Sequence, residues 1–175
     1  MIVDPTTSSQ PDEQRPEHAP QPYPQPLRPP GSRTPPLDRS DRALPAFARR
    51  ETVPQMVGSL ETESIVAHPR TIDQCREILE YCRDENLTLC PRGAGHSYGD
   101  MSLNDGQVLL DIRSMDRILD FDLESGRIVT EPGAQILDIY QVAHPHMYML
   151  PATPSEGTIT VAGAIANNVN GKDGW

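Results

Sequence analysis

Cysteine, long apolar runs and, in the second part of the chain, basic residues are scarce in this sequence of 175 residues. The three cysteines are an odd number without CxxC spacing, which is typical of reduced intracellular thiols and not of disulfides or a zinc site. No apolar run approaches the roughly 18–20 residues of a membrane helix, and none follows Met1 as in a secretory signal. These absences predict a soluble cytoplasmic protein without a transmembrane segment.

Charge and proline divide the chain into two regions. Residues 1–60 hold seven acidic and seven basic residues, and 12 of the 19 prolines lie within residues 1–50. Proline breaks helices, and too few large apolar side chains offset the entropy of ordering, so residues 1–60 are predicted to be a disordered, Pro-rich segment. Residues 61–175 hold 18 acidic and 8 basic residues and are predicted to form the folded part. Because phosphate contacts need clustered basic residues, no nucleic-acid partner is expected.

The hydrophobic pattern after residue 61 predicts a mixed α+β fold. A strand is expected at 64–67, a helix from residue 72 to about 85, and a second strand at 87–90, which together suggest a parallel pair with a right-handed crossover. The expected buried face of the helix consists of Ile72, Cys75, Ile78, Leu79 and Cys82.

Strands and turns are expected to dominate the rest of the chain. Strands are predicted at 108–111, 118–121 and 127–130, with a hairpin turn at 124–126. A second helix is expected with Ile136, Ile139, Tyr140 and Ala143 on one face, and a short helix is expected near 161–167. His144 and His146 have no carboxylate or thiolate at ligand spacing, so no metal site is predicted.

The strongest local signal is a glycine-rich stretch at 91–100, PRGAGHSYGD, directly after an expected strand. Gly93 and Gly95 allow positive φ and leave backbone N–H groups uncovered, so the loop can form a concavity for a phosphate, to which Ser97 adds a hydroxyl. The Rossmann fingerprint is absent because Gly99 comes one residue late and no helix pattern follows. A purely structural turn stays the alternative.

His96 has two interpretations: a hydrogen-bonded surface histidine, or a nucleophile that holds a covalent cofactor. A second signal is the Gly-, Ala- and Asn-rich segment at 158–172, whose small side chains let a flat ligand approach the backbone. Lys172, the only lysine, can supply positive charge to a reduced ring or a phosphate. The alternative for this segment is a small-residue helix packed on a sheet.

Four stretches in this order resemble the FAD-binding domain of the vanillyl-alcohol oxidase / p-cresol methylhydroxylase (PCMH-type) flavoproteins. They are PRGAGHSYGD, VLLDIRSMDRI, IVTEPGAQILDIY and PSEGTITVAGAIANNVNGK, and the resemblance that rests on them covers about Ser64 to Lys172. The sequence is most similar to the branch of aldonolactone and alditol oxidases and decaprenylphosphoryl-ribose oxidases. The resemblance implies an incomplete PCMH-type domain, with an N-terminal βαβ-type lobe and the start of a second sheet, that belongs to a longer enzyme.

The resemblance also implies FAD as the cofactor and identifies the residues that hold it. Residues 92–99 are expected to wrap the pyrophosphate with backbone amides. His96 matches a position where several members carry a histidyl–flavin bond, while others bind FAD non-covalently. The implied FAD-binding residues are Arg92, Gly93, Ala94, Gly95, His96, Ser97, Tyr98, Gly99, Thr158, Thr160, Gly163, Ala166 and Asn167.

The reaction implied by the resemblance is oxidation of a sugar-like or polyol alcohol, with a hydride moving to flavin N5, so the partners are this substrate and an electron acceptor. Asn170 and Lys172 are the candidate catalytic residues. Asn170 stands where the decaprenylphosphoryl-ribose oxidases have a His, and Asn cannot act as a titrating base. The base is therefore expected outside this chain, which alone is expected to be inactive. The rival hypothesis is a non-catalytic flavin-binding or interaction module whose Pro-rich arm recruits a partner.

Overall fold

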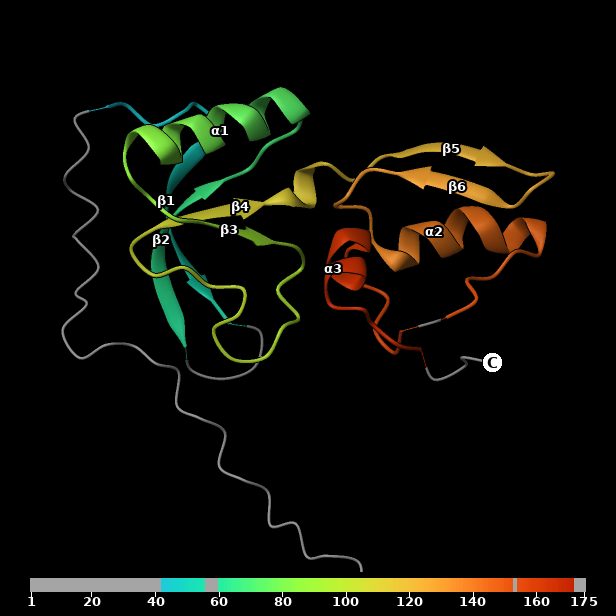
Figure 1. The fold of residues 1–175 in the computed structure, drawn as a ribbon. Helices are drawn as coiled ribbons and strands as arrows, with labels where there is room; N and C mark the ends of the chain where they lie inside the picture. The colour runs from blue at the N-terminus through green and yellow to red at the C-terminus, as the bar shows by residue number, and fades with distance from the viewer. Residues whose placement is uncertain (1–41, 56–59, 153, 172–175) are drawn as a thin grey trace, which may run out of the picture. The chain divides into compact units, whose positions relative to one another are not determined.

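The computed structural model describes residues 42–55, 60–152 and 154–171. These residues form a four-stranded mixed sheet in the order β1-β2-β4-β3 and a separate two-stranded sheet (Figure 1). None of the described helices is long and apolar enough to cross a membrane. The strands and helices are β1 (Ala48–Pro54), β2 (Glu61–Ala67), α1 (Ile72–Asp84), β3 (Leu89–Arg92), β4 (Val108–Asp111), β5 (Ile118–Asp122), β6 (Arg127–Thr130), α2 (Ile136–Ala143) and α3 (Val161–Ala166), with short 3₁₀ turns at 112–114 and 144–146.

Residues 1–60 were predicted to be disordered, but strand β1 lies near the end of that segment, so the prediction is wrong there. It pairs with β2 in antiparallel register, from Ala48 opposite Ala67 to Pro54 opposite Glu61. Only Ala48 and Val53 are buried, so the strand has no alternating apolar pattern and its sequence gave no strand signal. The prediction of disorder for residues 1–41 lies outside the described residues.

The predicted strand–helix–strand unit is present as β2, α1 and β3, but its two strands are not neighbours. Both run parallel to β4, which lies between them and pairs Val108 with Ile65 on one side and with Leu89 on the other. The predicted parallel direction is therefore confirmed, while direct pairing is wrong. Strand β4 takes the interior position between β2 and β3. All four of its residues are buried, as is typical of an interior parallel strand.

Alternate residues of β2 and β4 build two core clusters on opposite faces of the sheet. Ile65, Val108 and their same-face neighbours pack against α1, which lies across the sheet in Figure 1. Val66 and Leu109 point to the other face, where Leu103 of the long β3–β4 connection covers them. That connection carries the glycine-rich loop, so the second cluster anchors the base of the loop to the sheet.

Helix α1 begins after Thr71, whose hydroxyl accepts a hydrogen bond from the Gln74 amide at 3.2 Å. Its predicted buried face is partly wrong. Ile78 and Cys82 are buried, but Leu79 is 52% exposed and Ile72 is 61% exposed. The remaining buried position is Tyr81, which lies on the opposite side of Ile78 from the two exposed residues.

The expected hairpin, second helix and short helix are confirmed as β5–β6, α2 and α3. Residues 157–162 are held to residues 132–137 by four backbone hydrogen bonds, of which Ile136 to Ile159 (3.1 Å) and Leu137 to Gly157 (2.9 Å) are two. This pairing fixes residues 157–162, one of the two segments of interest for function.

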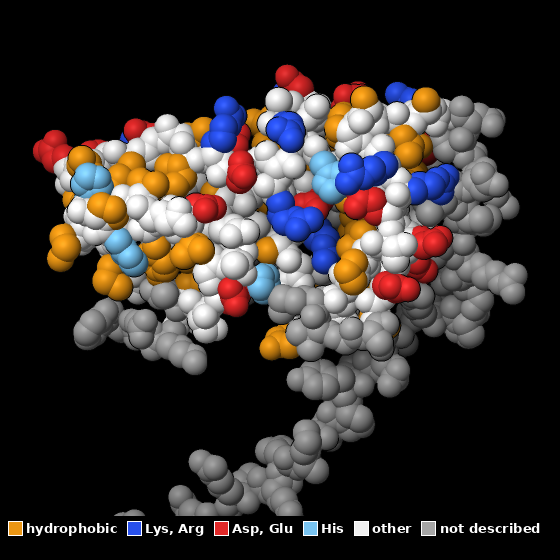
Figure 2. All heavy atoms as spheres, turned by 180° about the vertical axis from the view of Figure 1, so that it is seen from behind, with side chains coloured by type: hydrophobic (Ala, Val, Ile, Leu, Met, Phe, Trp, Pro, Cys, Tyr) orange, Lys and Arg blue, Asp and Glu red, His pale blue; other side chains and the backbone are white. Residues whose placement is uncertain are grey.

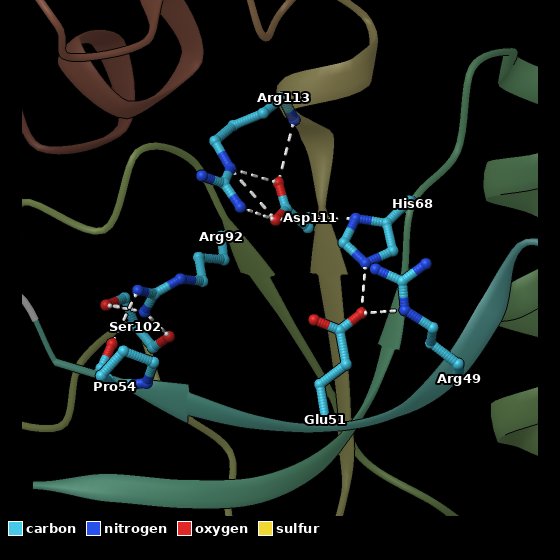
Figure 3. A network of polar contacts seen from close by, with 8 residues as sticks. All are labelled: Arg49, Glu51, Pro54, His68, Arg92, Ser102, Asp111 and Arg113. Atoms are coloured by element: carbon cyan, nitrogen blue, oxygen red, sulfur yellow. Dashed lines mark hydrogen bonds and ion pairs between the residues drawn. The ribbon is translucent and has the colours of Figure 1, made fainter.

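A polar network joins β1 to the ends of β2 and β4 (Figure 3). His68 Nε2 lies 2.7 Å from a Glu51 oxygen, and its Nδ1 lies 3.7 Å from the buried Asp111 carboxylate. Arg113 Nε donates to both oxygens of Asp111 at 2.9 and 3.1 Å. Figure 2 views the molecule from the side opposite to Figure 1 and shows basic and acidic side chains interspersed on the face that it displays.

Candidate functional site

A cleft of about 460 Å³ lies between two segments that are distant in the sequence. One wall is the glycine-rich loop after β3, and the other is α3 with the residues beside it. Gly95 belongs to the first wall and Gly163 to the second, so the two small-residue signals of the sequence meet in one site. The volume lies within the usual range of roughly 300–1,000 Å³ for small-molecule sites.

Arg92, the last residue of β3, fastens the loop from behind. Its guanidinium donates to the backbone oxygen of Ser102 at 2.8 Å, to the Ser102 hydroxyl at 2.9 Å and to the Pro54 oxygen at 3.0 Å (Figure 3). Arg92 at the start of the loop is therefore bonded to Ser102 at its far end and to Pro54 at the end of β1. Gly95 has φ of 78°, and a Cβ there would meet this guanidinium. Both facts explain why glycine stands at this turn.

The two walls touch where Gly93 meets Thr160. Thr160 is 1% exposed and caps α3, since its hydroxyl oxygen accepts a hydrogen bond from the Gly163 amide at 3.2 Å. A Cβ on Gly93 would collide with this oxygen. The absence of a side chain at Gly93 thus lets the cap and the loop come into contact at the floor of the cleft.

The second wall is shaped by residues with little or no side chain. Ala162, Gly163 and Ala166 present backbone and methyl groups to the cleft. Asn167, at the end of α3, also lines it and donates from Nδ2 to the Gly163 oxygen at 2.9 Å. A flat ligand can lie close to such a wall, as the sequence suggested.

His96 is half-buried on the loop and lines the cleft. Its Nε2 lies 3.0 Å from the hydroxyl oxygen of Thr158, which in turn donates to a Glu156 oxygen at 2.8 Å. The hydrogen bonds from Thr158, then the charge of His96, hold the pKa of Glu156 below its usual range. His96 thus joins the loop to the segment before α3 by a side-chain contact.

Ten of the predicted site residues line the cleft, and four further described ones do not. The guanidinium of Arg92 holds Ser102 and Pro54, and Arg92, Gly99, Thr158 and Asn170 are not among the lining residues. Lys172 lies outside the described residues. The ten residues that line the cleft are Gly93, Ala94, Gly95, His96, Ser97, Tyr98, Thr160, Gly163, Ala166 and Asn167.

Seven further lining residues were not among the predicted site residues. Most are apolar types that also fill cores, so their sequence alone carries no sign of a site. Ile112 comes from the turn after β4, and only the fold brings it to the loop. The others lie within the two recognised segments or, as Met101 and Ser102, directly after the first of them, a position that could have suggested them. The seven are Pro91, Met101, Ser102, Ile112, Ile159, Ala162 and Val169.

Comparison with known families places this cleft in context. A family model described as FAD binding domain matches residues 64–174. The chain belongs to this family. The predicted resemblance and the predicted cofactor, FAD, are thereby confirmed, and both walls of the cleft fall within the matched residues.

Curated relatives of this chain are oxidoreductases of several kinds. The chain is 27% identical over 110 residues to D-2-hydroxyglutarate–pyruvate transhydrogenase of Saccharomyces cerevisiae, covering 62% of this chain and 22% of the relative. It is 32% identical over 82 residues to decaprenylphosphoryl-β-D-ribose oxidase of Mycolicibacterium smegmatis, covering 47% and 18%. It is 26% identical over 102 residues to L-gulonolactone oxidase of Mus musculus, covering 58% and 23%. The chain thus spans about a fifth of each relative's length.

Solved structures show the same fold. Cholesterol oxidase from B. sterolicum superposes with a TM-score of 0.63 at 18% identity, over 74% of this chain and 27% of that one. Alkyldihydroxyacetonephosphate synthase superposes with a TM-score of 0.54 at 18% identity, over 63% and 23%. The α+β, FAD-binding PCMH-type class with only part of the domain present is therefore confirmed.

The geometry of the cleft fits a dinucleotide flavin. A side chain on Gly93 or Gly95 would strike Thr160 or Arg92, so the packing of this loop requires glycine at both positions. Backbone N–H groups of a glycine-rich loop can bind a diphosphate, and the small-residue wall opposite leaves room for a flat ring. Among the described residues, no group of three or more His, Cys, Asp or Glu is placed to hold a metal ion.

Proposed function

We propose that this chain is the FAD-binding part of an enzyme that oxidises an alcohol carbon of a sugar-like or polyol substrate and passes the electrons to an acceptor. The observation that carries the proposal is the meeting of the glycine-rich loop and the small-residue wall in one cleft, inside the residues matched by the FAD binding domain family. FAD, when bound, supplies the group that accepts a hydride from a C–H bond.

Each wall has a separate task in this proposal. The loop at 93–98, fixed by Arg92, binds the diphosphate through backbone amides. Gly163, Ala166 and Asn167 bind the ring and its ribityl arm, since they leave room beside the backbone. His96, on the loop beside Thr158, either bonds the flavin covalently or lines a site that holds it non-covalently.

The substrate class rests on the kinds of relatives. The names of two of them give a sugar-derived substrate, a ribose and a gulonolactone, and a third name gives a 2-hydroxy acid. An alcohol carbon is common to all of these. Asn170 and Lys172 remain the candidate residues beside the ring, with the proton-accepting base supplied from outside this chain.

FAD binding by the purified chain tests the cleft directly. Ala166→Leu fills the cleft while keeping a good helix former at that position, so it is expected to weaken FAD binding at least tenfold in a fluorescence-quenching titration. Ala46→Leu changes an exposed alanine outside the cleft and is expected to bind FAD like the wild type. Equal affinity of all three forms would place the flavin elsewhere.

The reaction is tested in the longest reading frame that contains this chain. Anaerobic loss of the visible flavin band on addition of an alditol or aldonolactone is the expected result. Bleaching by 2-hydroxy acids alone would overturn the substrate class and leave the flavin proposal standing. Colour that remains in the supernatant after acid precipitation would exclude the covalent bond to His96.

A further inference from the structure

A chain of three side chains ends at the cleft: Glu156, Thr158 and His96. A Glu156 oxygen accepts from the Thr158 backbone N–H at 3.2 Å and from the Thr158 hydroxyl at 2.8 Å. The same hydroxyl oxygen lies 3.0 Å from His96 Nε2. Of these three residues, only His96 has a part in holding the flavin in the proposed function.

The backbone on both sides of Thr158 is fixed, so the hydroxyl does not depend on a free loop for its position. Gly157 accepts a hydrogen bond from the Leu137 amide at 2.9 Å, and Ile159 accepts one from the Ile136 amide at 3.1 Å. Both donors belong to the first turn of α2. Thr158 is therefore presented to His96 from a paired segment.

Counting the protons along these contacts places a proton on Nε2 of His96. Hydrogen bonds from Thr158 lower the pKa of Glu156, so this carboxylate is ionised at neutral pH and can only accept. The single hydroxyl proton of Thr158 points to Glu156, which leaves only a lone pair toward the imidazole. Nε2 of His96 must then carry a proton and donate it.

We propose that Glu156 is a positioning residue that acts through the Thr158 hydroxyl to hold the neutral His96 ring with its proton on Nε2 and its lone pair on Nδ1. Among the described residues, no hydrogen bond to Nδ1 is present. Nδ1 is therefore the ring nitrogen that accepts a hydrogen bond or a proton from a molecule in the cleft. This property belongs to the chain without a ligand and goes beyond the proposed function.

The experiment reads the two ring nitrogens of His96 by long-range ¹H–¹⁵N correlation in the 175-residue chain labelled with ¹⁵N-histidine. The spectrum is recorded at about pH 8.5, where a histidine with the usual pKa of about 6.5 is neutral. His96→Gln assigns the signals by their loss. The wild type is expected to show a protonated Nε2 and an unprotonated, pyridine-like Nδ1 with widely separated shifts.

Two variants interrupt the chain of contacts at different places. Thr158→Val removes the hydroxyl, and Glu156→Gln replaces the acceptor-only group by one that can also donate. Both are expected to move the two nitrogen shifts of His96 toward each other, because the second tautomer becomes populated. Thr158→Ser keeps the hydroxyl and is expected to keep the wild-type pattern.

Matched controls separate this effect from general changes of the protein. Thr52→Val and Glu124→Gln alter exposed residues of the same types away from the cleft and are expected to leave His96 unchanged. The signals of His68, which contacts Glu51, report that each variant is folded. Unchanged His96 shifts in both Thr158→Val and Glu156→Gln, or a wild-type ring protonated on Nδ1, would overturn the proposal. Because no flavin is present, either result leaves the FAD proposal untouched.

Discussion

The hydroxyl oxygen of Thr160 occupies the place that a side chain on Gly93 would need. Gly93 opens the loop after β3, and Thr160 is the residue before α3 whose hydroxyl caps that helix. The close contact between Gly93 and the Thr160 hydroxyl therefore positions both the loop and the cap of α3, although the two residues are far apart in the sequence. A change at either position affects folding and ligand binding together.

Gly93→Ala is expected to destabilise the protein by about 1–3 kcal/mol, since the added methyl must displace buried Thr160. FAD affinity is expected to fall as well. Urea unfolding and FAD titration measure the two effects. The matched control is Gly157→Ala, whose Cβ would lie at an ordinary 3.5 Å from Leu137, and it is expected to change neither value. A Gly93→Ala protein as stable as the control would contradict the contact.

Arg92→Leu is expected to lower the free energy of unfolding by about 1.5–3 kcal/mol, the usual range for hydrogen bonds to a charged group. The variant removes three hydrogen bonds that hold Ser102 and Pro54. Chemical unfolding measures the loss, and hydrogen exchange is expected to increase in the loop. Arg76→Leu removes an exposed ion pair with Asp73 and is expected to cost at most about 0.5 kcal/mol. Equal costs for the two variants would show that Arg92 does not clamp the loop.

Ile78→Ala and Leu79→Ala test the orientation of α1. Ile78 is fully buried, so its truncation is expected to cost about 2–5 kcal/mol. Leu79 is 52% exposed, and its truncation is expected to cost less than about 1 kcal/mol. Unfolding curves of the two neighbours, compared at equal protein concentration, measure the difference. A larger loss for Leu79→Ala would mean that the helix is turned toward the face predicted from sequence.

Asp111 is expected to make stability fall in acid. Burial alone would raise the pKa of Asp111, but hydrogen bonds and the charge of Arg113, with a smaller contribution from His68, hold it below its usual range. A lowered folded-state pKa gives stability that is present above the unfolded value of about 3.9 and is lost as the pH falls through the folded value.

Unfolding in urea at several pH values between about 2 and 6 measures this dependence. Asp111→Asn is expected to flatten the slope by up to about 1.4 kcal/mol per pH unit, the value for one proton. Asp73→Asn, an exposed carboxylate in α1, is expected to keep the wild-type slope. Identical slopes for wild type and Asp111→Asn would contradict the linkage.

Local sequence patterns were sufficient for elements that carry their own signal. Strand β4 is a continuous apolar run and was predicted with its observed bounds, and α2 shows helical spacing from Ile136 to Ala143. The buried face of α1 was less clear because apolar residues lie on two sides of that helix. Tertiary packing selects the side of Tyr81, and no local pattern encodes that selection.

The parts that the sequence could not predict depend on contacts between distant segments. Strand β1 carries mostly polar residues and exists because β2 offers it a paired edge. The glycine loop and the small-residue segment were both recognised, yet the inward turn of Arg92 was not, since its partners Ser102 and Pro54 lie outside the motif. The insertion of β4 between β2 and β3 depends on the pairing of all four strands, and neither β2 nor β4 carries a local pattern that predicts it.

The central position of β4 constrains how a newly made chain can fold. When β3 leaves the ribosome, it has no strand beside it, because its hydrogen-bonding neighbour is still to be synthesised. Assembly of the sheet must wait until residues 108–111 enter between two strands made earlier. During that interval β2 is paired on one edge only, through β1, so synthesis stalled before Val108 would leave open the two strand edges, one of β2 and one of β3, that β4 covers in the finished sheet.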